Sequence, residues 1–156
     1  MNKLVEELFS VTEVELIYRN KRKPIDRPQV KESKTAYDLF IQSWDENKIE
    51  LLEQFKIMLL DRKNACIGIS TISMGGINAT VVDPKIIFAT ALKARASNIV
   101  LAHNHPSGNT KPSEQDMRLT QSLFKAGKFL EIEILDHLII TSENYLSFAD
   151  EGLMPS

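Results

Sequence analysis

The chain has 156 residues, of which 43% are hydrophobic and 26% charged, enough to form one globular domain with its own core. Its 19 basic and 21 acidic residues give a formal net charge of −2, which argues against strong nonspecific binding to nucleic acid. A single cysteine, Cys66, excludes an internal disulfide, and it lies in an apolar stretch where we expect a buried, inert thiol.

No apolar run reaches the roughly 18 residues that a membrane-spanning helix needs. Acidic residues interrupt the apolar part of the N-terminal segment, which therefore lacks the core of a signal peptide. We expect a cytoplasmic protein without membrane association.

Alternating apolar residues predict a strand over residues 12–18, followed by a polar connecting arm over 20–32. Ser33 is a candidate cap for a helix whose apolar positions share one face: Ala36, Tyr37, Phe40, Ile41 and Trp44. Three strands should follow at FKIMLLD, ACIGISTIS and INATVV, with turns at residues 61–64 and at Gly75-Gly76.

Asp83-Pro84 predicts the start of a helix that runs to about Arg95, because a capping Asp precedes proline at the first helical position. A buried strand at 98–102 and a polar loop come next. A helix from about Ser113 to Ala126 should stop at Gly127. The strand EIEILDHLIIT and the short element YLSF complete the chain.

Strands and helices thus alternate irregularly, with hairpin-like strand pairs early in the chain. This pattern favours an α/β fold of the α+β type, in which helices pack on a mixed sheet, over a regular doubly wound sheet. We expect residues 1–32 to form an N-terminal strand and arm, and residues 33–156 to form the domain.

The most informative segment is HNHPSGNTKPSEQD, residues 103–116. His103 and His105 lie two positions apart after a buried strand, so in extended backbone both imidazoles point the same way. Asp116 follows in the first turn of the next helix, and the prolines and glycine between suit a tight returning loop. Two imidazoles and one carboxylate could hold zinc and leave a fourth position for water, which zinc activates as a nucleophile near neutral pH.

A different interpretation competes for the same carboxylate. Ser113 and Asp116 also fit a capping box, in which the serine caps the helix and the acid bonds back to the backbone. A carboxylate held in this way would be less free to bind a metal, and the spacing alone does not separate the two interpretations.

The segment resembles the JAMM signature of His-x-His-Pro, six residues and Ser-x-x-Asp at every defined position. With LLDRKN before it and ILDHLII after it, the chain resembles the RadC-like branch of that family over about residues 33–154. The resemblance implies a JAB/MPN domain with α/β/α layers similar to those of cytidine deaminase. It also implies a zinc-dependent hydrolase, a metallopeptidase or isopeptidase in which zinc-activated water attacks an amide of a peptide or isopeptide substrate.

Carried over to this chain, the resemblance makes His103, His105 and Asp116 the zinc ligands. Ser113 would lie beside the site and help to stabilise the oxyanion of the tetrahedral intermediate. An upstream glutamate serves the family as general base, and Glu53 is the candidate here, with Glu50 as the alternative. The serine could equally act only as a helix cap, and either glutamate could be a solvated surface charge.

Asp136-His137 also matches the RadC-like pattern. Asp136 lies in an apolar run and needs a hydrogen-bond partner, either beside a zinc ligand or within the fold. His137 as a fourth metal ligand is disfavoured, because the fourth position is needed for water.

RadC-like proteins usually carry an N-terminal helix-hairpin-helix segment associated with DNA contact, and residues 1–32 do not match it. A DNA-repair-associated or DNA-binding module is therefore an alternative function with weaker support. The basic run Arg19, Lys21, Arg22, Lys23 and Arg27 would make such a contact, or it forms a solvated loop. A noncatalytic interaction domain is the third hypothesis, and the intact ligand set counts against it. The sequence defines neither the substrate nor the oligomeric state.

Overall fold

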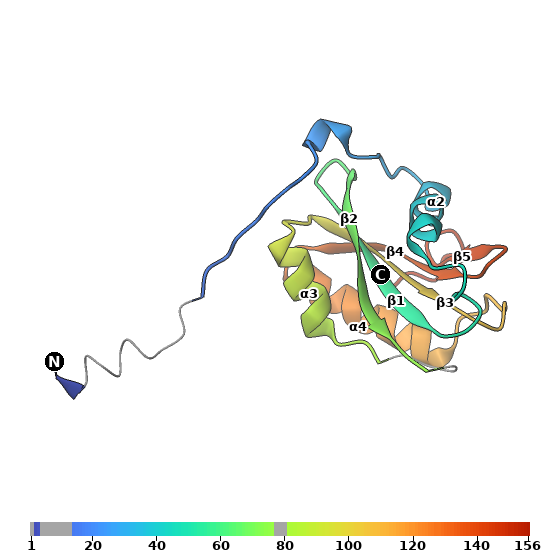
Figure 1. Ribbon diagram of the computed structural model, residues 1–156. Helices are drawn as coiled ribbons and strands as arrows, with labels where there is room; N and C mark the ends of the chain where they lie inside the picture. Colours follow the sequence, from blue (N-terminus) through green and yellow to red (C-terminus); the bar gives the residue numbers. More distant parts are fainter. Residues whose placement is uncertain (1, 4–13, 77–80) are drawn as a thin grey trace.

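A five-stranded mixed sheet organises the computed structural model, which describes residues 2, 3, 14–76 and 81–156 (Figure 1). The strand order is β2-β1-β3-β4-β5, and every neighbouring pair runs antiparallel except β3 and β4, which run parallel. The strands are β1 (Gln54–Leu60), β2 (Cys66–Met74), β3 (Asn98–Asn104), β4 (Glu133–Ile140) and β5 (Tyr145–Ser147). The predicted mixed α/β sheet is confirmed.

Helices cover both faces of this sheet, which gives the expected three layers. Helix α2 packs on one face, and α3 and α4 pack on the other (Figure 1). A short 3-10 helix, η1, lies in the segment that leads into the domain. The bounds are η1 (Pro24–Asp26), α2 (Ser33–Ser43), α3 (Pro84–Lys93) and α4 (Glu114–Phe129).

Strand β1, which lies between β2 and β3, is buried along its whole length, including its two polar residues Gln54 and Lys56. Successive side chains of a strand point to opposite faces of the sheet. Met58 and Leu60 accordingly pack in the core below α2, whereas Ile57 and Leu59 pack in the core below α3 and α4. This alternation decides which side chains of β3 and β4 can reach the candidate site.

The helix starts agree with the sequence in one case and differ in another. Asp83 caps α3 as predicted, since its side chain accepts a hydrogen bond from the Lys85 backbone N–H at 2.9 Å. The predicted cap at Ser33 is wrong, because Glu32 occupies the cap position of α2 without a side-chain capping bond. The Ser33 hydroxyl lies 3.0 Å from the hydroxyl of Tyr145 instead, so it fastens the helix to β5.

The predicted helix stop at Gly127 is also wrong, because α4 continues through this residue to Phe129. A Cβ atom on Gly127 would lie 2.4 Å from the carbonyl oxygen of Ile132 and 3.3 Å from the Ile134 side chain. The glycine is therefore required for the close approach of α4 to the start of β4. The helix is capped at Leu130, and Glu131 then takes the left-handed conformation with φ 57°.

The predicted strand at 12–18 is absent from its described part, since residues 14–18 form an exposed arm outside the domain (Figure 1). A strand needs a hydrogen-bonded neighbour, and this segment pairs with no strand. Of the predicted strand at 77–82, residues 77–80 lie outside the described part, and residues 81–82 belong to no strand. Within the described residues, every helix is too short or too polar to cross a membrane.

Candidate metal centre

The C-terminal end of β3 supplies the two histidines of the site. His103 belongs to the strand and points to the same face as Ile99 and Leu101, which pack toward α3 and α4. Its side chain is buried. His105 follows the strand end, where its backbone N–H donates to the carbonyl of Ile140 at 3.0 Å and thereby continues the alignment with β4.

The first turn of α4 supplies the carboxylate. The loop from His105 turns at Gly108, which adopts φ 84° and donates its N–H to the His105 carbonyl at 3.0 Å. Ser113 then caps the helix: its hydroxyl accepts from the Asp116 N–H at 3.0 Å, and its own N–H donates to Asp116 Oδ2 at 2.8 Å. The capping box is thus present, and it aims the Asp116 carboxylate at the histidines.

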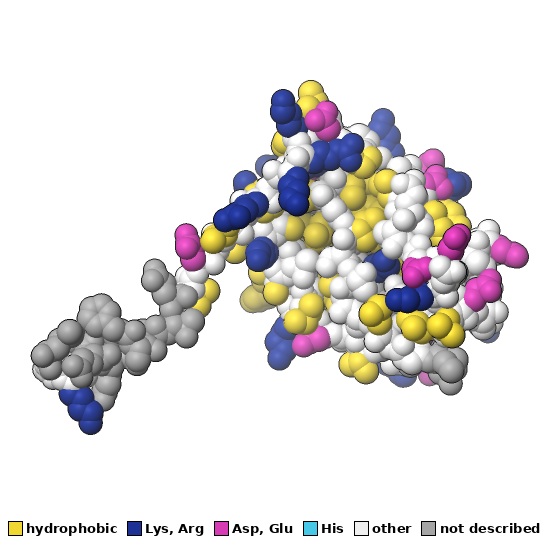
Figure 2. Space-filling view, in the orientation of Figure 1, with side chains coloured by type: hydrophobic (Ala, Val, Ile, Leu, Met, Phe, Trp, Pro, Cys, Tyr) yellow, Lys and Arg dark blue, Asp and Glu magenta, His cyan; other side chains and the backbone are white. Residues whose placement is uncertain are grey.

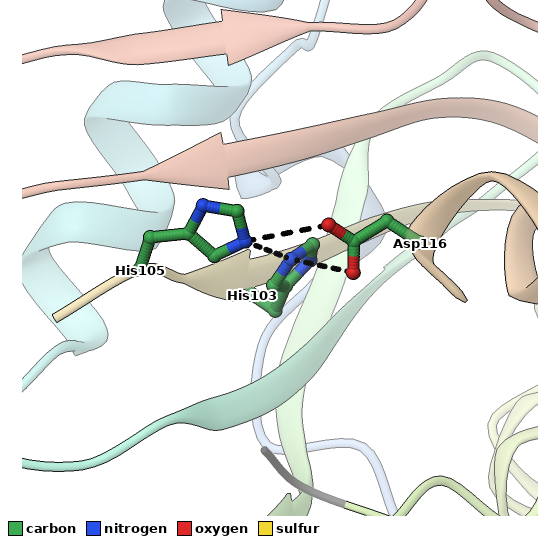
Figure 3. Close-up of side chains that lie close together, drawn as sticks. All are labelled: His103, His105 and Asp116. Atoms are coloured by element: carbon green, nitrogen blue, oxygen red, sulfur yellow. Dashed lines mark hydrogen bonds and ion pairs between the residues drawn. The ribbon is translucent and has the colours of Figure 1, made fainter. Parts of the chain in front are cut away.

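The three side chains converge as Figure 3 shows, with one ligand atom of each within 4.8 Å of the others. His103 Nε2 lies 3.0 Å from His105 Nε2 and 3.3 Å from Asp116 Oδ1. Asp116 Oδ2 lies 3.4 Å from His105 Nε2. The two interpretations of Asp116 are therefore compatible, because the carboxylate satisfies the helix start and faces both imidazoles.

These separations are short enough for the three side chains to share one metal ion. Zinc–nitrogen bonds of about 2.0–2.1 Å place two ligand atoms about 3.3 Å apart at tetrahedral angles. The two imidazole nitrogens are 3.0 Å apart, and each faces a different oxygen of Asp116, at 3.3 Å for Oδ1 and 3.4 Å for Oδ2. The group can hold a metal ion by three protein ligands, and this set leaves one position for a water or a substrate.

The carboxylate of Asp116 and the imidazole of His105 shift each other's pKa values toward the charged forms. Burial alone would raise the pKa of Asp116, but its hydrogen bonds with His103 and His105 hold that pKa far below its usual range. For His105, burial lowers the pKa of the imidazole, whereas the Asp116 carboxylate and the Asn109 carbonyl raise it above the ordinary value. The carboxylate is therefore ionised at neutral pH, as a metal ligand must be.

A backbone carbonyl fixes the orientation of His105. The Nδ1 atom lies 2.6 Å from the carbonyl oxygen of Asn109, which can only accept a hydrogen bond. Nδ1 therefore carries the proton, and in the neutral ring Nε2 presents its lone pair to His103 and Asp116.

His137 lies behind His103 and not at the position expected of a fourth ligand. Its Nε2 contacts His103 Nδ1 at 2.8 Å, and its Nδ1 contacts the hydroxyl of Thr120 at 2.6 Å. Burial, followed by the charge of His103, places the pKa of His137 well below its usual value. Asp136 points to the opposite face, where it accepts from the Ser147 hydroxyl at 2.5 Å and from the Ala149 N–H at 2.9 Å. Its hydrogen bonds stabilise the fold and do not reach the candidate ligands.

Glu53 is held at the start of β1, beside the cluster. Its backbone N–H donates to the Gly76 carbonyl at 3.4 Å, and its carbonyl accepts from Gly75 at 2.9 Å. Burial raises the pKa of the half-buried carboxyl group, and the charges of His103 and His105 lower it. Glu53 is thus electrostatically coupled to the predicted ligands, while its catalytic role stays a prediction.

Glu50 is exposed, and its carboxylate accepts a hydrogen bond from Ser142 at 2.7 Å. It lines a cavity of about 390 Å³ together with His105 and Pro106. The choice between Glu53 and Glu50 as general base therefore stays a prediction.

The side chain of Asn104 connects the end of β3 to the segment before β1, a role that was not predicted from the sequence. It lies between the two histidines and is fully buried on the opposite face of the sheet. Its amide nitrogen donates to the carbonyls of Ile49 and Leu52 at 2.7 and 2.9 Å, and its oxygen accepts from the Gln54 N–H at 2.7 Å. The signal that could have found it is a buried strand that ends in a polar amide, which must be satisfied internally.

Comparison with known proteins assigns the family. Residues 30–153 match the family described as the RadC-like JAB domain. The chain is 45% identical over 102 residues to a UPF0758 protein of Syntrophomonas wolfei, covering 65% of this chain and 43% of that protein. It is 37% identical over 132 residues to a UPF0758 protein of Methanosarcina mazei, covering 83% of this chain and 56% of that protein.

The chain thus spans about half the length of the curated relatives that it matches. The family match covers most of the chain, and the observed mixed sheet agrees with it. This protein belongs to the family of RadC-like JAB domains.

Proposed function

We propose that this chain is a zinc-dependent hydrolase of the JAMM type that cleaves amide bonds, as a metallopeptidase or an isopeptidase. The observation that carries the proposal is the convergence of His103 and His105, at the end of β3, with Asp116 of α4, with one ligand atom of each within 4.8 Å of the others. Membership of a JAB-domain family supports the same class of chemistry.

The donor set favours zinc among the common divalent ions. Two imidazole nitrogens and one carboxylate are the ligands of many catalytic zinc sites, whereas calcium and magnesium prefer oxygen donors. When bound here, zinc supplies a Lewis acid that polarises a carbonyl and activates water near neutral pH. His105 and Asp116 are partly exposed, with side chains 18% and 13% accessible, so water and substrate can reach the open side.

Glu53 provides the proton transfer in this proposal. Its carboxylate takes a proton from the attacking water while the water oxygen bonds to the amide carbon. It then gives that proton to the nitrogen as the carbon–nitrogen bond breaks, so that an acid and an amine leave. Partial burial, which raises the pKa of Glu53, suits a group that must both accept and release a proton.

Ser113 provides a donor for the carbonyl oxygen. In the capping box its hydroxyl uses a lone pair to accept from the Asp116 N–H, so the hydroxyl proton is not consumed by the cap. This proton can be donated to the oxygen that becomes negative in the transition state. The cavity beside His105 provides room for the substrate next to the cleaved bond.

The test combines metal analysis with amide cleavage. Purified protein should contain close to one zinc per chain and should cleave peptide or isopeptide substrates from a library. His103→Ala should lose both zinc and cleavage, whereas Glu53→Gln should retain zinc and lose cleavage by about 100-fold or more. Glu46→Gln changes an exposed glutamate of the same loop and should leave both measurements unchanged.

Two results would contradict the proposal. One is zinc-loaded protein without activity on any substrate of the library. The other is a Glu53→Gln variant that cleaves as fast as the unmodified chain. A loss of activity in Glu50→Gln with normal activity in Glu53→Gln would move the general base to Glu50.

One observation favours a second candidate, contact with DNA. Lysine and arginine side chains gather on the arm and where it joins the domain (Figure 2). Arg19, Lys21 and Arg22 are exposed there, whereas Arg27 pairs with Asp61 at 3.1 Å. This candidate requires salt-dependent binding of single-stranded or duplex DNA that is lost when those three residues are changed to glutamine. A flat titration with both forms of DNA would remove it.

A further inference from the structure

A buried chain of hydrogen bonds runs from His103 away from the open side of the site. His103 Nδ1 contacts His137 Nε2 at 2.8 Å, and His137 Nδ1 contacts the hydroxyl of Thr120 at 2.6 Å. Thr120 in turn donates to the backbone carbonyl of Asp116 at 2.7 Å. The residues His103, His137 and Thr120 are each at most 1% exposed, so their side chains satisfy each other without bulk water.

The environment of His137 keeps its ring neutral. The ring stacks on Phe148 at 4.8 Å between centroids and meets the edge of Phe55 at 5.6 Å. Each of its ring nitrogens contacts one polar group: Nδ1 contacts the Thr120 hydroxyl, and Nε2 contacts the imidazole of His103. A charged imidazolium would be costly to bury among these groups, so the ring carries a single proton.

Counting protons then leaves two arrangements of the chain. In the first, Thr120 donates to the Asp116 carbonyl, His137 Nδ1–H donates to the Thr120 oxygen, and His103 Nδ1–H donates to His137 Nε2. In the second, Thr120 donates to His137 Nδ1, and His137 Nε2–H donates to His103 Nδ1. Only the first arrangement leaves His103 Nε2 with a free lone pair in the neutral ring.

We propose that Thr120 and His137 are positioning residues that hold the His103 proton on Nδ1, so that the Nε2 lone pair faces the metal. The donor geometry of Thr120 toward the Asp116 carbonyl, one helical turn earlier, belongs to this first arrangement. This inference rests on the metal site of the proposed function, and it concerns metal binding and not the cleavage step.

The arrangement also joins two ligands mechanically. Thr120 lies one turn after Asp116 on α4, and His137 lies on β4, next to β3. The hydrogen bonds therefore link the imidazole of His103 to the helical turn that carries the carboxylate. His105 takes its proton position from a different partner, the Asn109 carbonyl, so the two histidines are oriented independently.

The experiment measures zinc affinity by competition with a chromophoric chelator. Thr120→Val removes the oxygen that accepts from His137 and should weaken zinc binding by about 10- to 100-fold. Thr120→Ser keeps the hydroxyl and should restore affinity to within about threefold. Thr90→Val is the matched control, because Thr90 also donates to the carbonyl four residues earlier, at 2.7 Å, but on α3.

A second measurement reads the proton positions directly. Nitrogen-15 NMR of the zinc-loaded unmodified chain should show protons on Nδ1 of both His103 and His137. This measurement also decides the matter if Thr120→Val fails to fold, as judged by its circular dichroism and thermal melt.

The outcomes separate the two proposals. Equal zinc affinity in folded Thr120→Val and in the unmodified chain would overturn this inference alone, as would a His137 proton on Nε2 in the zinc-loaded state. Failure of the unmodified chain to bind zinc would overturn the metal site of the proposed function, and this inference with it.

Discussion

Replacing Asn104 with alanine should strongly destabilise the domain. Its side chain makes three hydrogen bonds to backbone groups, at 2.7, 2.7 and 2.9 Å, and it is fully buried. Alanine leaves two carbonyls and one N–H without that partner. Each buried group left unsatisfied costs about 1 kcal/mol or more, so we expect a loss of about 3 kcal/mol.

Urea unfolding followed by circular dichroism measures this loss. With a slope of about 2 kcal/mol per molar urea, the unfolding midpoint should fall by about 1.5 M. Asn47→Ala changes an exposed asparagine of the preceding loop and should leave the midpoint within error. A shift of less than about 0.3 M for Asn104→Ala would refute the reasoning, because the three bonds would then contribute little to the segment that carries Glu53.

Three further outcomes follow from the structure. Gly127→Ala should lose about 1–3 kcal/mol in thermal unfolding, because its Cβ meets the carbonyl oxygen of Ile132, just before β4, whereas Gly68→Ala, with open space around it, should change little. In the metal-free protein, the lowered pKa of Asp116 contributes stability that is present above about pH 4 and is lost as the pH falls below that value. The free energy of unfolding of Asp116→Asn should therefore depend less on pH in the acid range. Zinc at 100 times its dissociation constant should stabilise the unmodified chain by about 2.7 kcal/mol in a thermal-shift assay, and the stabilisation should be absent in His103→Ala.

The sequence predicted the elements whose signals are local. The alternation of apolar runs and turns located β1 to β4, and the Asp83-Pro84 pair located the start of α3. The histidine spacing and the first helical turn made a convergence of His103, His105 and Asp116 possible, and the resemblance to the JAMM signature was needed to predict it.

The features that the sequence did not predict depend on contacts between distant segments. Gly127 looked like a helix stop because a pattern cannot show that Ile132 approaches within van der Waals distance. The alternating apolar residues at 14–18 looked like a strand, although no strand among the described residues pairs with them. The place of His137 required the register of β4 against β3, which aligns His137 with Leu101, two residues before His103.

The predicted ligands all come from one short continuous stretch, 103–116, whereas the predicted base sits on a separate hairpin. Under the proposed function, metal binding and proton transfer are consequently separable by mutation. A single change at position 53 would then abolish turnover and leave a protein that still binds its metal ion. Metal content by itself would not distinguish such a variant from an active enzyme.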